Sequence, residues 1–399
     1  MTNKNIPNVR FVGFDDVWEK KFFTDFLTRK TASSDSAKLP KLEFEDIISG
    51  EGRLNKDISK KFDDRKGVEF REKDILFGKL RPYLKNWYYA DFPGVALGDF
   101  WVFEADNSDT SFDYYLIQAP HFQKVANDTS GTKMPRSDWK TVSNTKYAIP
   151  TSIAEQSQIG SLFSTIDSLL SFYKDNLENY QAFKKSMLSK MFPRAGQTVP
   201  EIRLDGFESE WEKRKLNTIV ERVTRKNSEL ISERALTISA QYGLVDQEDF
   251  FNKKVASKDV SGYYLINNGE FAYNKSYSNG YPLGTIKRLD KYKCGVLSTL
   301  YILFRPIDVN SDFLACYYES NKWHKEVSMC AAEGARNHGL LNIAPADFFN
   351  TELVIPRDKA EQRAIGSFFS NLDELISSYQ TKIDELEMLK KKLLQDMFV

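Results

Sequence analysis

Hydrophobic residues recur at heptad spacing in two long segments, residues 151–193 and 357–399. Steps of three and four residues alternate, which is typical of a helix that buries one seam against another helix. No proline lies between residues 151 and 192 or between 357 and 398. We therefore predict one long helix in each segment, with seam residues Leu170, Tyr173, Leu177 and Tyr180 in the first and Ile376, Tyr379, Ile383 and Leu386 in the second.

Both predicted helices begin with a capping pattern. Ser152 and Glu155 form the S-x-x-E pattern of a capping box, in which the glutamate side chain reaches back to the cap. Asp358 and Glu361 repeat this pattern with aspartate as the cap.

The two predicted helices should pack on each other in antiparallel orientation. The linker 194–199 is short and turn-forming, so the second globular unit should start near the far end of the first helix and return its own helix to the start. Lys184 and Lys390 occupy matching seam positions. These lysines either set the register of the pair or extend to solvent.

The chain is an internal duplication. Residues 149–192 align with residues 355–398 at an offset of 206 without a gap, and residues 6–21 align with 199–214 at an offset of 193 with seven identities. The 13 additional residues of the second copy therefore lie between these ends. Constant ends indicate one shared mechanical role, and divergent middles indicate two different targets.

The two middle regions read as mixed α/β domains. Short β-rich runs alternate with turn signals, at residues 74–77, 87–90 and 100–103 and again at 270–273, 285–289 and 300–304. We predict an α+β fold with two globular α/β domains separated by a rod of two antiparallel coiled-coil helices, related by a pseudo-twofold repeat. The predicted domains are residues 1–150 and 200–356, with spacer helices at 151–193 and 357–399 and a linker at 194–199.

Polar, basic and aromatic loops lie between the predicted strands, at residues 78–89, 128–140, 274–284 and 333–342. Arginine and lysine suit guanine edges and phosphates, and asparagine suits adenine. Lys79 and Lys275 each follow a strand at the same place in the two copies, which predicts a shared phosphate contact. The candidate DNA-binding residues are Lys79, Arg81, Lys85, Thr132, Lys133 and Arg136 in the first copy, and Asn274, Lys275, Tyr277, Arg336, Asn337 and His338 in the second.

Charge and composition narrow the class of protein. The 399 residues contain 56 Lys+Arg and 56 Asp+Glu, which excludes a histone-like chain that binds nucleic acid by bulk charge. Three cysteines without CxxC spacing signal neither a disulfide framework nor a zinc site. No apolar run suits a membrane span and no signal peptide stands at the start, so we expect a cytoplasmic protein without membrane contact.

Catalytic and metal-binding patterns are absent from the sequence. There is no HExxH or other histidine ligand spacing, no P-loop, no G-x-S-x-G elbow and no strand followed by G-x-G-x-x-G. Asp99 has no identifiable partner carboxylate. We therefore predict no catalytic residue, no metal site and no cofactor on this chain.

The duplicated segments resemble the specificity subunit of type I restriction-modification systems. The resemblance rests on Ile149-Pro150, Ala154-Glu155-Gln156, Ile159-Gly160 and Met191-Phe192, on their copies 206 residues later, and on the two P-x-x-R-x-x-G-F-x-x-x-W-E-K segments. It covers nearly the whole chain. It implies two target-recognition domains that each read half of a split, asymmetric site on double-stranded DNA, and a helical rod that fixes the distance between the half-sites.

The same resemblance implies the partners. Two methyltransferase (modification) subunits would dock on the chain, restriction (motor-nuclease) subunits would join them, and S-adenosylmethionine would be bound by the methyltransferase. The chain itself would be a non-catalytic subunit that directs adenine methylation and cleavage.

Two other interpretations stay open. The chain could be the recognition module of a related restriction-methylation enzyme outside type I, which co-purification with or without a motor subunit would separate. It could also be a coiled-coil protein scaffold without a DNA role. The Arg/Lys/Asn-rich loops argue against a scaffold, and a gel shift with the partner methyltransferase would decide.

Overall fold

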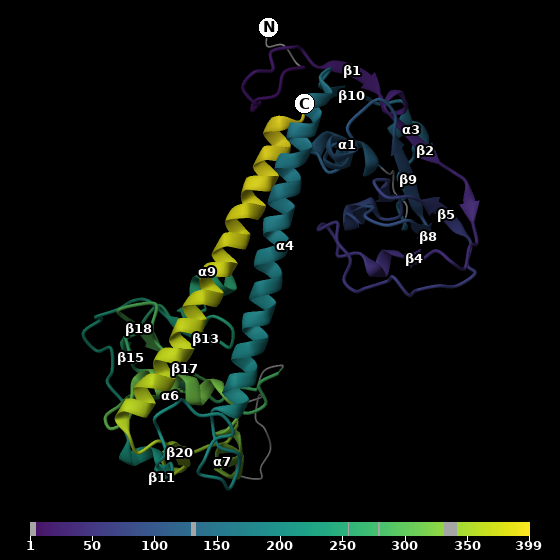
Figure 1. Cartoon of the computed structure of the whole chain (residues 1–399). Coiled ribbons are helices and arrows are strands. Elements are labelled where there is room, and N and C mark those ends of the chain that lie inside the picture. The colour runs from purple at the N-terminus through teal and green to yellow at the C-terminus, as the bar shows by residue number, and fades with distance from the viewer. Residues whose placement is uncertain (1–4, 129–132, 254, 278–279, 331–340) are drawn as a thin grey trace. The chain divides into compact units, whose positions relative to one another are not determined.

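The computed structural model describes residues 5–128, 133–253, 255–277, 280–330 and 341–399 (Figure 1). Its contacts divide the chain into two compact units, Met1–Asn176 with Tyr379–Val399, and Leu177–Ser378. The first unit is therefore discontinuous in sequence. The two boundaries between the units, after Asn176 and after Ser378, fall inside the long helices. The predicted domain limits, residues 1–150 and 200–356, stay a prediction.

The first unit contains two four-stranded sheets and one strand pair. The first sheet is antiparallel, with the order β2 (Leu27–Lys30), β9 (Phe100–Ala105), β6 (Ile75–Gly78), β7 (Trp87–Tyr89). The second has the order β3 (Ser33–Ser34), β5 (Gly67–Phe70), β8 (Gly94–Ala96), β4 (Lys41–Leu42). β1 (Glu19–Phe22) pairs with β10 (Lys146–Ile149), and the short helices are α1 (Thr110–Leu116), α2 (Pro120–Ala126) and α3 (Trp139–Ser143).

The described part of the second unit repeats the first of these sheets and the closing strand pair, but two separate strand pairs stand where the first unit has its second sheet. Its four-stranded antiparallel sheet has the order β12 (Val220–Val223), β19 (Ile302–Pro306), β16 (Phe271–Asn274), β17 (Thr285–Arg288). The strand pairs are β11 (Glu212–Lys215) with β20 (Glu352–Ile355), β13 (Leu236–Ser239) with β14 (Gly243–Asp246), and β15 (Tyr264–Asn267) with β18 (Cys294–Leu297). The short helices are α5 (Gln247–Phe251), α6 (Ser311–Glu319), α7 (His324–Cys330) and α8 (Pro345–Phe349).

Strand register confirms the internal repeat. Glu19 pairs with Ile149 in β1–β10, and Glu212 pairs with Ile355 in β11–β20. These are the residues that the two sequence offsets equate, so the duplicated ends close each unit in the same way. The six β-rich runs predicted from the sequence become β6, β7, β9, β16, β17 and β19. The mixed α/β fold class is therefore confirmed.

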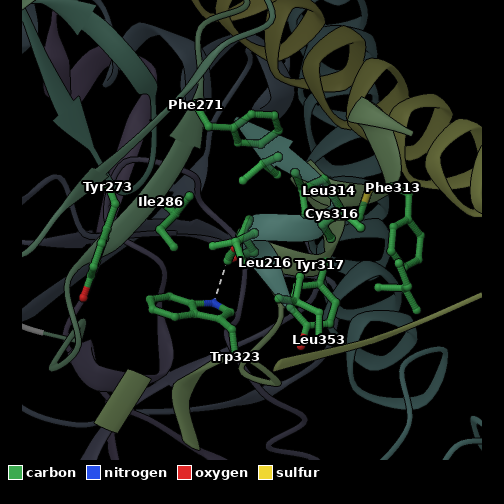
Figure 2. Close-up of a cluster of buried hydrophobic side chains, with 14 of the residues drawn as sticks. Leu216, Phe271, Tyr273, Ile286, Phe313, Leu314, Cys316, Tyr317, Trp323 and Leu353 are labelled. Atoms are coloured by element: carbon green, nitrogen blue, oxygen red, sulfur yellow. Dashed lines mark hydrogen bonds between the residues drawn. The ribbon is translucent and has the colours of Figure 1, made fainter. Parts of the chain in front are cut away.

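Aromatic side chains fill both cores. In the first unit, Phe23 contacts Phe103 and Phe122, and all three are fully buried. In the second unit, Figure 2 shows Phe271, Phe313, Tyr317 and other buried side chains in one cluster, where the Trp323 indole donates to the Tyr318 carbonyl at 3.1 Å. Burial of this kind is the main stabilising contribution to each unit.

The two long helices are α4 (Ile153–Lys190) and α9 (Lys359–Met397), of 38 and 39 residues. They pair in antiparallel orientation, because in the first unit Phe163 contacts Phe398 and Lys174 lies 2.6 Å from Glu387. In the second unit Phe192, just beyond α4, stacks on Phe369. In the described part of the chain, no helix is both long and apolar enough to cross a membrane.

The helix starts differ from the predicted capping boxes in one respect. Ser152 Oγ accepts from the Glu155 amide at 3.4 Å and Asp358 Oδ1 from the Ala360 amide at 2.7 Å, so both caps exist. The sequence predicted that the Glu155 and Glu361 carboxylates would reach back to the caps, but in the structure they do not. Each is instead occupied by an arginine and a tryptophan, described below, which offer a buried carboxylate stronger hydrogen bonds than an exposed cap amide does.

Candidate nucleic-acid interface

The six predicted DNA-binding residues of the first unit lie in two segments, residues 78–89 and 128–140, and three of them are brought together. Leu80, after β6, forms an isolated bridge with Arg136 of the second segment. The Arg81 amide donates to the Pro135 carbonyl at 2.7 Å, and the Ser137 amide donates to the Lys79 carbonyl at 2.8 Å. Lys79, Arg81 and Arg136 therefore share one surface, whereas Lys133 is exposed three residues further back.

Asp99 forms ion pairs with two of these three basic residues, Lys79 and Arg136. One of its oxygens, Oδ2, accepts from Arg136 Nη2 at 3.0 Å and from Nε at 3.3 Å, and Oδ1 lies 3.5 Å from Lys79 Nζ. This role of Asp99 could not be inferred from the sequence, because Asp99 is 20 residues from Lys79 and 37 from Arg136. Only the antiparallel pairing of β6 with β9, which sets Gly78 beside Phe100, places them together.

Arg81 and Lys85 flank a short turn, Pro82–Leu84. Both have left-handed backbones, with φ of 50° and 54°, an uncommon conformation for residues with side chains. The Lys85 carbonyl accepts from the Gly50 amide at 3.0 Å, and its side chain lines a cavity of about 620 Å³ with Trp87, Lys174 and Lys390. Lys85 thus lines this cavity, whose lining does not include Arg136. Thr132 lies outside the described residues.

In the second unit, Lys275 follows β16 as Lys79 follows β6. The Lys275 carbonyl accepts from the Leu341 amide at 3.0 Å, which matches the bond between Lys79 and Ser137. Its ammonium group donates to the Ile343 carbonyl at 3.1 Å, and burial lowers the pKa of Lys275. In the described ranges no carboxylate forms an ion pair with Lys275, so this charge is available to an anion.

The remaining predicted residues of the second unit are placed less fully. Asn274 ends β16, and its side-chain oxygen accepts from the Ser276 amide at 3.0 Å, so its amide group can still donate. Tyr277 is exposed. Arg336, Asn337 and His338 lie outside the described residues, so their predicted contacts stay a prediction.

In each unit a matched buried cluster ties the segment before the first strand to the long helix. Arg10 donates to the Glu155 carboxylate through Nε at 2.6 Å and Nη2 at 2.8 Å, and the Trp18 indole donates to it at 3.2 Å. In the second copy Arg203 and Trp211 bind Glu361 at 2.7, 2.7 and 3.1 Å. All six residues are identical between the copies, and the identities were the sequence signal for this cluster.

A second matched contact follows one residue later in each helix. Gln156 accepts from the Asp109 amide and donates to the Pro150 carbonyl, both at 2.8 Å. Gln362 binds the Asn310 amide and the Pro356 carbonyl at the same distances. Asp109 and Asn310 cap α1 and α6, so the long helices hold the same short helix in both units.

The matched seam lysines form ion pairs with matched aspartates. Lys390 Nζ lies 2.6 Å from Asp167 in the first unit, and Lys184 contacts Asp373 and Glu319 in the second. The lysine side chains are only 12% and 13% exposed, so they do not extend to solvent.

The predicted seam residues lie between the helices to different degrees. Leu170 and Ile383 are buried, and the rings of Tyr173 and Tyr379 lie 5.4 Å apart. The other predicted seam residues are half-buried: Leu177, Tyr180, Ile376 and Leu386.

The chain is similar to known proteins in both sequence and fold. Residues 16–179 match the family model of the type I restriction modification DNA specificity domain. Over 301 residues the chain is 23% identical to the type I restriction enzyme MjaVIII specificity subunit of Methanocaldococcus jannaschii, which covers 71% of this chain and 68% of that protein.

Two solved structures share the fold. The crystal structure of a type I restriction-modification S subunit from M. genitalium superposes with a TM-score of 0.64 at 13% identity, covering 99% of both chains. A chain from a study of complex assembly and conformational transition of the type I R-M system gives a TM-score of 0.51 at 15% identity, covering 96% of this chain and 98% of that one. In its matched domain, its relative and its duplicated fold, this chain is similar to the specificity subunits of type I restriction-modification systems.

Proposed function

We propose that the chain recognises a two-part site on double-stranded DNA, with one domain of each copy reading one half-site. It then directs a partner adenine methyltransferase, present as two modification subunits, and restriction (motor-nuclease) subunits to that site. The chain contributes recognition and no catalytic group, and S-adenosylmethionine is bound by the methyltransferase.

One observation carries this proposal. The two units share the strand order of one four-stranded sheet, the strand register at their ends and the arginine–glutamate–tryptophan cluster, but differ in the loops that follow β6 and β16. Lys79 and Lys275 stand at the same place, yet one faces Asp99 and the other a backbone carbonyl. A common frame with different polar loops suits two domains that read different base sequences.

The formal net charge of +0 supports a shared role in DNA binding. A chain without excess positive charge gains little affinity from phosphate contacts by bulk charge, since that part of binding scales with the number of phosphates neutralised. Local groups such as Lys79, Arg81 and Arg136 supply part of the positive surface, and the methyltransferase subunits supply the remainder.

Methylome sequencing tests the proposal. Cells that express this chain with its methyltransferase should carry methyladenine in one asymmetric motif of two specified parts separated by unspecified bases. Cells with the methyltransferase alone are the control and should lack that methylation. A motif that does not change when this chain is exchanged for another specificity subunit would contradict the proposal.

A further inference from the structure

We propose that Asp99 holds Arg136 in position to read a guanine, so that this pair determines one base of the site recognised by the first unit. The inference rests on the proposed DNA-binding function. It goes beyond that function by naming the pair of side chains and the base.

The hydrogen bonds of Arg136 leave one edge of the guanidinium group free. Asp99 Oδ2 takes the Nε hydrogen and one Nη2 hydrogen, at 3.3 and 3.0 Å. Of the five N–H donors, both on Nη1 and the second on Nη2 remain. These face away from Asp99, and the side chain is 54% exposed. Two parallel donors on one edge match the O6 and N7 acceptors of guanine in the major groove.

The backbone beneath Arg136 is fixed on both sides. Pro135 accepts from the Arg81 amide, and the Ser137 amide donates to Lys79. Ser137 is also buried, and its hydroxyl donates to the Ala126 carbonyl at 2.7 Å. An arginine held at its backbone and at its guanidinium group loses less conformational freedom on binding, so its contact favours one geometry.

Asp99 also reduces attraction to DNA of arbitrary sequence. Its carboxylate lies against both Lys79 and Arg136, and it is itself 26% exposed. A negative charge there offsets the attraction of two cations for phosphate and repels a misplaced backbone. Lys275, at the matched place in the second unit, donates to a carbonyl instead, and no carboxylate among the described residues forms an ion pair with it.

The decisive experiment uses the full chain assembled with its methyltransferase, at one fixed salt concentration. Each guanine of the first half-site is replaced singly by 7-deazaguanine, which lacks the N7 acceptor. Wild type should lose about ten-fold in affinity at one position, because one charge-assisted hydrogen bond is lost. Arg136→Ala should bind the natural site more weakly and become insensitive to the analogue at that position.

Further variants separate base reading from charge and from folding. Arg136→Lys keeps the charge but loses the bidentate edge, so it should keep its affinity for unrelated DNA and lose discrimination. Asp99→Asn should bind unrelated DNA several-fold more tightly, while its preference for the cognate site falls. If Asp99 only supported the fold, the substitution would instead weaken binding to unrelated and cognate DNA alike. Arg305→Ala is the matched control, since Arg305 is also 54% exposed and bonds Glu221 through Nε and Nη2.

Three results would overturn the inference. These are a first half-site without guanine, a loss from 7-deazaguanine that persists in Arg136→Ala, and an Asp99→Asn variant with unchanged specificity. Absence of any sequence-specific binding by the wild-type complex would instead contradict the proposed function itself.

Discussion

The ammonium group of Lys390 lies 2.6 Å from the carboxylate of Asp167, and the equivalent residues of the other copies, Lys184 and Asp373, form the reciprocal pair. The lysine of each copy thus pairs with the aspartate of the other. Asp167 also accepts from the Tyr115 hydroxyl at 3.0 Å, so the first pair is part of a small buried network.

The first prediction concerns this network. Asp167→Asn should lower the free energy of unfolding by roughly 1–3 kcal/mol, since it leaves a largely buried ammonium group without its counter-ion. Adding Lys390→Met to the Asp167→Asn variant should lower the free energy of unfolding only slightly further. Chemical denaturation of the four members of this double-mutant cycle measures the coupling, which should exceed about 0.5 kcal/mol. Strict additivity would show that the two residues do not act together.

The second prediction concerns the buried glutamates. Glu155→Gln should destabilise the chain by about 3 kcal/mol, because Arg10 is then left with a neutral partner in a site that is 1% exposed on the glutamate side. Glu361→Gln should destabilise the chain by a similar amount, because Arg203 then loses its charged partner. Glu221→Gln removes an exposed pair with Arg305 and should change stability by about 0–1 kcal/mol. Equal effects of all three variants would contradict a buried anchoring role.

The third prediction is a pH dependence. Asp113 is fully buried, its Oδ1 has no hydrogen-bond partner in the described part of the chain, and burial raises its pKa well above the usual range. A group whose folded pKa is raised contributes stability that is present at low pH and is lost as the pH rises through that pKa. Asp113→Asn cannot ionise, so it should be more stable than wild type at pH 8 by about 1 kcal/mol or more.

Thermal unfolding between pH 4 and pH 8 measures this difference. The advantage of Asp113→Asn should shrink as the pH falls, because the wild-type carboxyl is then neutral in both states. Asp106→Asn, at an exposed site, is the control and should show no such trend. A pH-independent difference for Asp113→Asn would mean that the carboxyl is not neutral in the folded chain.

The fourth prediction assigns Lys275 to a phosphate. Lys275→Ala should weaken binding to cognate and mismatched duplexes equally, and it should lower the salt slope by about one unit. Arg336→Ala should instead relax the preference at one base position, at a cost of about 1–3 kcal/mol. A salt titration of the assembled methyltransferase on both duplexes distinguishes these roles. The two roles are inverted if Lys275→Ala changes the discrimination between cognate and mismatched duplexes more than Arg336→Ala does.

Alkaline pH gives an independent check on Lys275. Burial lowers its pKa, whereas a bound phosphate stabilises the charged form, so DNA binding should take up a proton as the free lysine begins to lose its charge. Affinity should therefore fall more steeply with rising pH for wild type than for Lys275→Arg, whose charge does not titrate in this range.

The architecture was largely predictable because duplicated residues carry it. Heptad spacing and the absence of proline located α4 and α9, and short apolar runs between turn signals located β6, β9, β16 and β19. These signals are local, and each element needs only its own residues to be recognised.

The interactions of charged groups were harder to predict. Glu155 was expected to cap its own helix, but it binds Arg10, which is 145 residues away, and Asp99 was left without a role. Such pairs depend on which loops the strands bring together. Spacing along the chain carries no information about that, and only the identity of Arg10 and Glu155 with Arg203 and Glu361 pointed to a shared contact.

The first unit includes the last residues of the chain, Tyr379–Val399, and Phe398 packs there on Phe112 and Phe163. During synthesis the N-terminal 176 residues therefore leave the ribosome long before the segment that completes their core. Until residues 379–399 have been synthesised, this half of the protein exposes an apolar site that proteases and chaperones can recognise. A chain that lacks residues 379–399 keeps that site open, so the first unit is completed only when this segment packs on it.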